Sequence, residues 1–442
     1  MRNIKLTFWG LVVLLSGLWL AADAVLFRPY EFFALRSSLI NYTGILGIGV
    51  MSVAMILAVR PVFFEPFLGG LDKMYRLHKW LGISALLIAI MHWLWTQAPK
   101  WMVGLGWLAR PERHHARGAS EGLQQFLESQ RGPAEAVGEW AFYAAVLLIV
   151  LALMKRFPYR YFFGTHRLLA IVYLLLVYHS LILMSFSYWS EGVAPVITGL
   201  MTAGSVAALG ILFGTVGQGR RAVGVIEEIT HHRDVRAVEV GILIRGRWSG
   251  HQPGQFAFVT FDAQEGPHPF TITSAWQGDG RMQFVIKALG DYTQSLPSAL
   301  QVGDPVKIEG PYGQFNFRSN KPRQIWVAGG IGITPFIARM QQRARQSDGK
   351  IVDLFYCTML ADDAVIGRLR RDAQEARVTL HVLVKARDGL LKAQQICRAV
   401  PKWQSSDVWF CGPAAFGHDL RRDFRGRGLA ADDFHQELFD LR

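Results

Sequence analysis

The fold is decided by two apolar stretches, Tyr75-Arg-Leu-His78-Lys-Trp-Leu-Gly-Ile-Ser-Ala-Leu-Leu-Ile-Ala-Ile-Met-His92 and Gly164-Thr-His166-Arg-Leu-Leu-Ala-Ile-Val-Tyr-Leu-Leu-Leu-Val-Tyr-His179. Each stretch carries two histidines, which are 14 residues apart in the first and 13 apart in the second. In a helix, either spacing separates the two imidazoles by about 20 Å, which is most of a bilayer core of about 30 Å. Because an ionisable group inside a membrane span is costly, the four histidines are candidates for a functional site.

Pairing by depth matches His78 with His166 and His92 with His179. Such pairs predict two stacked haems, because neutral imidazole suits haem iron and two axial imidazoles favour electron transfer over ligand chemistry. The alternative is that these histidines only form hydrogen bonds between helices. A spacing of 13 residues falls about 140° short of whole turns. The second helix therefore contains a bulge or kink, or its haems approach it from different sides.

The cysteines indicate that the haems are not covalently attached. The chain has three, Cys357, Cys397 and Cys411, all in its second half. None belongs to a C-x-x-C-H haem attachment or to an iron–sulfur spacing. The predicted haems are therefore of the b type.

Composition divides the chain of 442 residues, 51% of them hydrophobic, into an apolar half and a more polar half. Apolar runs of membrane-crossing length are found at 6–27, 38–59, 77–97, 137–154, 162–185 and 194–216. Residues 1–24 resemble a signal peptide with a cleavage site at Ala22-Asp-Ala24. Cleavage would leave five spans and put the polar half on the wrong side, so we expect this span to be retained.

The net charge of +13 follows membrane topology and does not indicate a nucleic-acid partner. Lys and Arg cluster at alternate span ends, which predicts a multi-pass protein of the cell membrane with both termini and the polar half in the cytoplasm. The clustered residues are Arg2, Lys5, Arg60, Lys73, Arg76, Lys79, Lys155, Arg156, Arg160, Arg167, Arg220 and Arg221.

Three arginines lie where haem propionates would need cations. Arg76 and Arg167 are close in sequence to the inner ligands His78 and His166. Arg36 precedes the second span on the outer side, where it is either a surface arginine or a partner of an outer propionate. The outer loop 98–136 carries His114-His115, which are either solvated or a metal site.

The polar half opens with short β-rich runs at 223–229, 235–244 and 256–261, which predict a small antiparallel barrel. Two segments of it offer hydroxyls, backbone amides and one cation near tight turns, a combination that suits a pyrophosphate. They contain His268, Pro269, Phe270, Thr271 and Thr273 in the first, and Lys287, Gly290 and Thr293 in the second.

From Gln324 onward the pattern becomes α/β. A buried strand at 325–328 leads into Gly329-Gly330-Ile-Gly332-Ile-Thr334-Pro335 and then a helix. Glycines between a strand and a helix N-terminus suit dinucleotide phosphates. Further strands at 352–357, 379–384 and 408–410, the last followed by Cys411-Gly412-Pro413, predict a doubly wound sheet with its ligand at the C-terminal strand edge.

Together these residues resemble the NADPH oxidase and ferric reductase superfamily from about Gly44 to Arg442. The resemblance rests on the histidine spacings and on four motifs. These are His268-Pro269-Phe270-Thr271, then Lys287 with Gly290 and Thr293, then Gly330, Gly332, Thr334 and Pro335, and last Cys411-Gly412-Pro413.

The resemblance implies electron flow from NADPH or NADH through FAD and two haems to an acceptor outside, dioxygen or ferric iron. The alternative is an electron-supply subunit that reduces a redox partner protein or quinone. We expect a six-span membrane α-helical bundle at 1–217, a soluble FAD-binding β-barrel at 218–320 and an NAD(P)-binding α/β domain at 321–442.

The resemblance also assigns catalytic roles and marks two departures. Cys411 would lie at the nicotinamide, and a terminal aromatic, Phe439, would cover the flavin or simply pack, since Leu441 holds a position often aromatic in relatives. Met359 stands where NADPH-specific relatives have an arginine, and Thr96 where animal oxidases have a histidine. Preference for NADPH and production of superoxide therefore do not carry over.

Overall fold

The computed structural model describes residues 2–23, 31–109, 122–154 and 156–437. Their contacts divide the chain into two compact units. One comprises residues 1–63 and 73–216, and the other residues 64–72 and 217–441.

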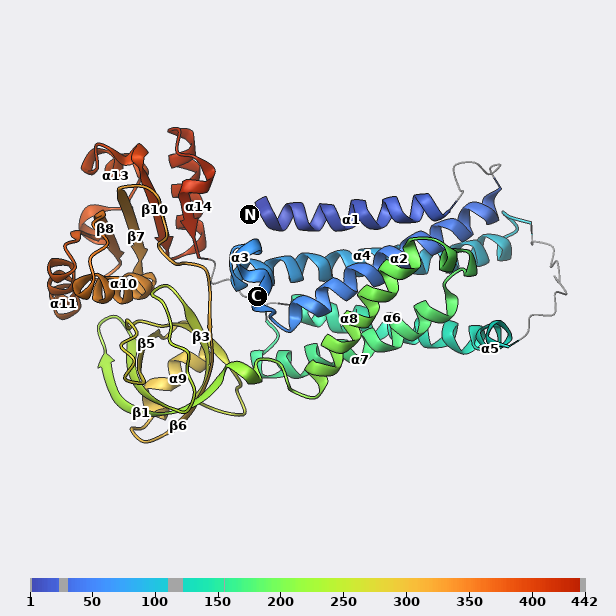
Figure 1. Ribbon diagram of the computed structural model, residues 1–442, viewed down its shortest axis with the longest axis horizontal. Helices are drawn as coiled ribbons and strands as arrows, with labels where there is room; N and C mark the ends of the chain where they lie inside the picture. Colours follow the sequence, from blue (N-terminus) through green and yellow to red (C-terminus); the bar gives the residue numbers. More distant parts are fainter. Residues whose placement is uncertain (1, 24–30, 110–121, 155, 438–442) are drawn as a thin grey trace. The chain divides into compact units, whose positions relative to one another are not determined.

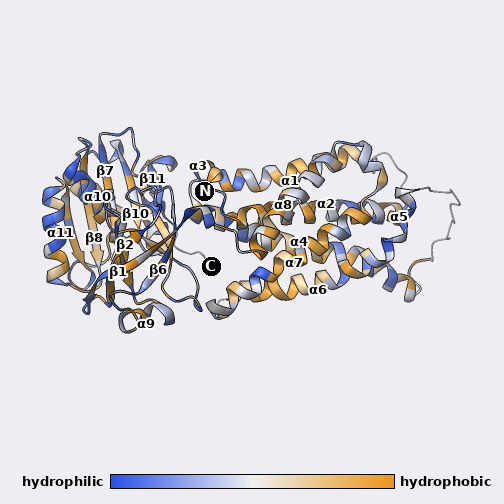
Figure 2. Ribbon diagram, turned by 60° about the horizontal axis from the view of Figure 1, so that its bottom comes forward, coloured by the Kyte–Doolittle hydropathy of each residue, from blue (hydrophilic) through white to orange (hydrophobic). Residues whose placement is uncertain are grey.

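The first unit is a bundle of long helices (Figure 1). Among the described residues, six helices are long and apolar enough to cross a membrane, which confirms the predicted number of spans. They are α1 (Arg2–Ala22), α2 (Phe32–Ala58), α4 (Leu71–Gly104), α6 (Arg131–Leu153), α7 (Tyr159–Leu183) and α8 (Val193–Leu212). Most residues of these helices are apolar (Figure 2), as contact with lipid requires.

Close helix packing in this bundle depends on small residues. A Cβ atom at Gly49 of α2 would lie 2.5 Å from Leu15 of α1, and one at Gly204 of α8 would lie 2.1 Å from the Tyr173 hydroxyl of α7. Helices in lipid gain stability from such close approach, because no hydrophobic driving force acts between them.

The second unit begins with a six-stranded antiparallel sheet in the order β4-β3-β6-β1-β2-β5. The bridge between Ile272 and Phe284 brings its two edges together, so the sheet is compatible with the predicted barrel. Its strands are β1 (Arg221–His232), β2 (Ala237–Arg245), β3 (Phe256–Thr260), β4 (His268–Thr271), β5 (Arg281–Lys287) and β6 (Pro305–Tyr312). The helix α9 (Asp291–Ala299) contributes Leu296 to the same core.

A second sheet, all parallel, has the order β11-β10-β7-β8-β9. Its strands are β7 (Arg323–Gly329), β8 (Ile351–Thr358), β9 (Thr379–Val384), β10 (Ser406–Cys411) and β11 (Phe434–Gln436). Its helices are α10 (Thr334–Arg345), α11 (Asp363–Glu375), α12 (Lys385–Asp388), α13 (Ala393–Ala399) and α14 (Ala414–Gly426).

Helices cover both faces of this sheet, as predicted. Phe336 of α10 and Leu369 of α11 belong to one apolar cluster, whereas Ile396 of α13 and Phe424 of α14 belong to another. The chain runs from β7 outward to β8 and β9, then crosses back to place β10 on the other side of β7. The strand order therefore reverses between β7 and β10, which is where open α/β sheets bind their ligands.

The sheets confirm the predicted fold class, and the strand at 379–384 has the predicted bounds. The domain boundaries at 218 and 321 stay a prediction.

Candidate functional site

The four membrane histidines come together as the two predicted pairs. The ring centroids of His78 on α4 and His166 on α7 are 5.9 Å apart, and the two ring planes are inclined by 74°. Those of His92 and His179 are 6.3 Å apart, inclined by 81°. Two imidazole nitrogens that share one metal ion, each about 2 Å from it, put the ring centroids about 6 Å apart. Both pairs therefore have the separation that a metal ion between them requires.

Hydrogen bonds orient three of the four rings for this purpose. Nδ1 of His78 lies 2.9 Å from the Ala54 carbonyl, and Nδ1 of His179 lies 2.8 Å from the Ala134 carbonyl. A carbonyl only accepts, so Nδ1 must carry the proton in both rings, and Nε2 is left as the free lone pair. Metal-binding histidines typically have this second contact.

The tautomer of His92 follows from its neighbour Thr43. The Thr43 hydroxyl donates to the Leu39 carbonyl at 2.7 Å, so its oxygen accepts from Nδ1 of His92 at 3.0 Å. The fourth ring, His166, stacks on Phe162, with ring centroids 5.0 Å apart. Its buried Nδ1 has no hydrogen-bond partner among the described residues.

Two glycines that the sequence analysis assigned no role at the histidines lie beside the pair of His92 and His179. A Cβ atom at Gly138 of α6 would lie 2.0 Å from Nδ1 of His179, and one at Gly44 of α2 would lie 3.6 Å from Cε1 of His92. Gly138 is one turn beyond Ala134, whose carbonyl accepts from His179. Small residues four apart, Gly138 inside the predicted span 137–154 and Ala134 just before it, are a signal that could have identified this contact.

The helix α7 runs without interruption from Tyr159 to Leu183. No π-helical bulge interrupts α7 between the two histidines, so a spacing of 13 residues makes His166 and His179 leave α7 in different directions. This agrees with the second of the two geometric alternatives.

Two of the three arginines proposed for propionates already donate to helix carbonyls. Arg36 donates from Nε to the Trp95 carbonyl at 3.1 Å and from Nη2 to the Thr96 carbonyl at 3.4 Å. Pro99 has no N–H, so it cannot supply the helical bond that the Trp95 carbonyl would otherwise accept. Arg167 donates to the Leu212 carbonyl. A role for Arg36, Arg167 or Arg76 with propionates stays a prediction.

The first predicted flavin segment forms β4 and the residues after it. His268 stacks on Tyr292 of α9, with ring centroids 4.3 Å apart. Burial lowers the pKa of His268 to about 4, so this ring is neutral and is not the cation for a pyrophosphate. Thr273 is buried, and its hydroxyl accepts from the Val285 amide at 3.2 Å. Thr271 is also buried, whereas Pro269 and Phe270 are half-buried.

The second flavin segment forms a capped turn before α9. The Thr293 hydroxyl oxygen accepts from the amides of Leu289 and Gly290, at 2.9 and 3.0 Å. Apart from its chain neighbours, no atom of the described residues lies within 4 Å of where a Cβ at Gly290 would be, so this part of the chain leaves the approach to the N-terminus of α9 open. Lys287 ends β5, and its Nζ lies 4.0 Å from where a Cβ at Gly330 would be. The structure thus brings the barrel cation next to the glycine-rich loop.

The glycine-rich loop and the Cys411-Gly412-Pro413 turn meet at the reversal between β7 and β10. A Cβ at Gly332 would lie 2.2 Å from the Cys411 carbonyl oxygen, and one at Gly329 would lie 2.8 Å from Pro413. Packing between the two turns therefore requires these glycines. Gly330 has a φ of 57°, in the left-handed region, and among the described residues Lys287 is the one side chain within 4 Å of where its Cβ would be.

Of the two predicted catalytic residues, Cys411 belongs to the described part of the chain and Phe439 does not. Cys411 is fully buried, and burial raises the pKa of its thiol well above the ordinary value. The thiol is therefore neutral and does not act as a thiolate, and a catalytic role for Cys411 stays a prediction. Phe439, like Leu441, the His114-His115 pair and Ala24 of the possible cleavage site, lies outside the described residues.

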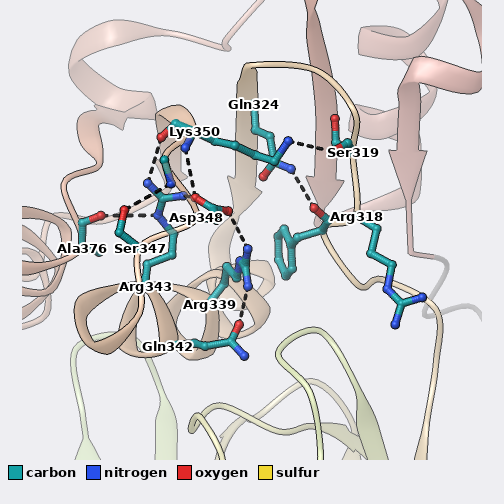
Figure 3. Close-up of polar contacts among 12 residues, drawn as sticks. Arg318, Ser319, Gln324, Arg339, Gln342, Arg343, Ser347, Asp348, Lys350 and Ala376 are labelled. Atoms are coloured by element: carbon teal, nitrogen blue, oxygen red, sulfur yellow. Dashed lines mark hydrogen bonds and ion pairs between the residues drawn. The ribbon is translucent and has the colours of Figure 1, made fainter.

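Two arginines of α10, the buried Arg343 and the half-buried Arg339, form ion pairs and hydrogen bonds within the protein (Figure 3). Arg343 donates to Asp348 and to the Lys350 carbonyl, and Arg339 donates to Asp348 at 2.7 Å. Lys350 precedes β8, so this cluster lies at the N-terminal edge of the sheet, opposite the glycine-rich loop. At the other end of β8, the side chain of Met359 is 61% exposed.

Two protein families match this chain. The Ferric reductase like transmembrane component family matches residues 43–177, which include His78, His92 and His166 and end two residues before His179. The FAD-binding domain family matches residues 238–316, which include both flavin segments.

Curated relatives match over part of the chain. The toluate 1,2-dioxygenase electron transfer component of Pseudomonas putida is 26% identical over 197 residues, covering 42% of this chain and 58% of that protein. The flavohemoprotein of Candida norvegensis is 26% identical over 204 residues, covering 45% of this chain and 49% of that protein. The chain spans about half the length of the curated relatives it matches.

Among solved structures, the FAD/NAD-binding domain of nitric oxide dioxygenase from Vibrio cholerae O1 biovar El Tor gives a TM-score of 0.44 at 19% identity, covering 49% of this chain and 98% of that one. The chain is therefore similar to the ferric reductase transmembrane component over its membrane helices and to an FAD-binding domain over its barrel.

Proposed function

We propose that this protein moves electrons from cytoplasmic NAD(P)H through FAD, across the membrane, to a small acceptor on the outer side, dioxygen or ferric iron. The observation that carries the proposal is the pair of histidine contacts, 5.9 and 6.3 Å between ring centroids. Each links α4 to α7 at a different depth. Bound between these rings, two b-type haems would supply one-electron carriers, and FAD would convert a hydride into single electrons.

The membrane residues have two tasks in this proposal. His78 and His166 would hold the inner haem, and His92 and His179 the outer one. The carbonyls of Ala54 and Ala134 fix two of the rings with Nε2 toward the metal, which also makes imidazole a better ligand. With two histidines held to each metal ion, neither would offer a free site for dioxygen, so these residues favour electron transfer over ligand binding.

The residues of the second unit would bind and orient the two dinucleotides. The open N-terminus of α9 suits the flavin pyrophosphate, and Thr293 holds the turn that shapes it. Gly330, with its open surroundings, suits the phosphates of NAD(P)H at the start of α10. Lys287, close to Gly330, is positioned to neutralise phosphate charge at this junction.

The donor proposed here is NADH in preference to NADPH. The 2′-phosphate of NADPH is normally held by an arginine near the adenosine ribose. Met359 is apolar and exposed at the end of β8, and Arg339 and Arg343 are engaged at the opposite edge of the sheet. NADH needs no cation at this position.

A second candidate function is electron supply to a partner protein or quinone. The observation that favours it is that several relatives are named as electron transfer or reductase components of oxygenases. Besides the toluate dioxygenase component, they include the reductase component of propane 2-monooxygenase from Mycolicibacterium goodii, 23% identical over 230 residues. In this case the outer haem would donate to a docked partner, and the isolated protein would reduce oxygen and ferric chelates slowly.

The deciding experiment uses the full-length protein in nanodiscs. We expect about two haems per chain by pyridine haemochrome analysis, and loss of one haem, not both, in each His→Ala variant. Acceptor profiling with NADH and with NADPH then separates the candidates. Steady superoxide formation or ferric reduction supports the first, and reduction of quinone alone supports the second. A wild-type protein without haem absorbance would rule out the proposal.

A further inference from the structure

A basic pocket lies on the barrel beside the second predicted flavin segment, since Ala288 and Gln294 of its lining directly follow Lys287 and Thr293. It has a volume of about 260 Å³, and its lining includes His231, His232, Arg233 and Arg236 from the β1–β2 hairpin and Gln294 from α9. None of the predicted flavin residues lines it. The pocket therefore is a candidate for a separate ligand.

The hairpin is anchored so that its basic side chains surround this pocket. The Arg236 amide donates to the Arg233 carbonyl at 3.1 Å, which closes the turn. The Arg236 carbonyl in turn accepts from the Ala288 amide at 2.9 Å, which ties the hairpin to the segment before α9. Arg236 has a φ of 52°, a left-handed conformation in which a residue other than glycine is uncommon.

The positive charge of the pocket is not neutralised by nearby carboxylates. Glu239 accepts from His232 at 3.0 Å and from Arg368 at 3.0 Å, so Arg368 already balances its charge. Asp234 lies in the same turn but is paired with neither arginine. Within the described part of the chain, the guanidinium groups of Arg233 and Arg236 have no hydrogen-bond or ion-pair partner.

We propose that this pocket binds a phosphate-bearing anion, held by Arg233 and Arg236 together with His231. The planar guanidinium fork matches phosphate oxygens in pairs, and two such groups beside imidazole donors form a site for a dianion. The volume is at the small end for ligand pockets, which suits a single phosphate group and not a dinucleotide. Two sources present this chemistry, a free phosphate compound and the headgroup of an anionic phospholipid.

The test measures how fast phenylglyoxal modifies each arginine of the full-length protein, read by mass spectrometry of the digested chain. One arm adds inorganic phosphate to protein in phosphatidylcholine nanodiscs, with chloride at equal ionic strength as reference. The other arm replaces part of the lipid with phosphatidic acid. Arg345, exposed at the end of α10, is the internal control in both.

At a phosphate concentration about ten times the Kd, Arg233 and Arg236 should react about tenfold more slowly, with Arg345 unchanged. Protection in the first arm identifies a site for free phosphate compounds, and protection in the second arm alone identifies a headgroup site. No protection in either arm, or equal protection of Arg345, overturns the proposal.

The substitution Arg236→Gly gives a matched variant, because glycine adopts a positive φ without strain. It removes the guanidinium and keeps the turn. We expect Arg233 to lose its protection in this variant, while FAD content and NADH oxidation stay at the wild-type level. Loss of FAD in R236G would assign the pocket to the flavin site and overturn the proposal. The variant Arg233→Gln, in the same exposed turn, is an independent repeat. In this variant, Arg236 should lose its protection from phenylglyoxal.

Discussion

A methyl group at Gly138 would lie 2.0 Å from Nδ1 of His179. The glycine on α6 therefore makes the space in which the outer histidine turns its ring and donates to the Ala134 carbonyl. No nearby atom can yield cheaply, because the conflict is with the imidazole itself.

The Gly138→Ala variant should lose the outer haem and keep the inner one. Overpacking at a tight contact costs about 1–3 kcal/mol, and here it is relieved only by displacing the His179 ring. We expect haem content to fall to about half of the wild-type value by pyridine haemochrome, as for one of two predicted sites. Gly164→Ala is the matched control, because its Cβ meets nothing within 4 Å. Full haem content in G138A would show that His179 can bind or pack without that space.

Arg36 and Pro99 should be energetically coupled. Arg36 donates to the Trp95 carbonyl that Pro99 leaves without its helical partner. Replacing Arg36 with Met should lower the free energy of unfolding by about 1.5–3 kcal/mol, the usual contribution of a hydrogen bond from a charged group. In a Pro99→Ala background, an alanine N–H is available to the carbonyl, so the same substitution should cost less. Thermal unfolding of the four proteins in nanodiscs measures this double-mutant cycle.

An equal cost of Arg36→Met in both backgrounds would contradict that coupling. If haem content also fell, a propionate contact would be the better account of Arg36.

Acid should destabilise the barrel through His251. This ring is buried, and its Nε2 donates to the Ser274 carbonyl at 2.9 Å. Burial lowers the pKa of His251 to about 4, whereas an unfolded histidine titrates near 6.5. Between these values the unfolded chain binds more protons, so stability falls as pH drops from about 6.5 to about 4, by up to about 3 kcal/mol. The effect is absent above about pH 7.

The variant His251→Gln keeps a donor for the Ser274 carbonyl and removes the titrating group. Its unfolding temperature, followed by tryptophan fluorescence, should therefore depend less on pH across this window than that of the wild type. His418→Gln, at an exposed position on α14, is the control. An unchanged acid slope in H251Q would assign the acid sensitivity to other groups.

A cation at position 359 should shift donor preference toward NADPH. Met359 is exposed just beyond the end of β8. A charge-assisted hydrogen bond contributes about 1.5–3 kcal/mol, so Met359→Arg should raise the ratio of kcat/KM for NADPH to that for NADH about ten- to hundredfold. Ile351→Arg places the same charge at the other end of β8, where the ratio should stay constant. An equal gain in both variants would indicate general electrostatic attraction instead of a 2′-phosphate contact.

The sequence alone was sufficient for the features that depend on local pattern. Apolar runs of about 20 residues predict helical membrane spans, because backbone N–H and C=O groups in lipid must form their hydrogen bonds within the chain. The histidine spacings also predict two pairs at matching depths, because a helix rises by a constant distance per residue. These pairs are His78 with His166 and His92 with His179. The pattern of apolar residues predicts the strand at 379–384. The glycines between a buried strand and a helix predict the phosphate-binding loop at Gly329 and Gly330.

Only the tertiary structure decided the contacts between segments distant in the chain. The sequence could not indicate that Gly138 faces His179, that Arg36 reaches the Trp95 carbonyl, or that Lys287 lies beside Gly330. Hydropathy and helical period give the depth and face of a residue within its own helix, but not the neighbour that this face meets. That neighbour depends on how six helices and two sheets pack. This is why the ligands of the predicted haems could be named in advance, whereas the groups that orient those ligands could not.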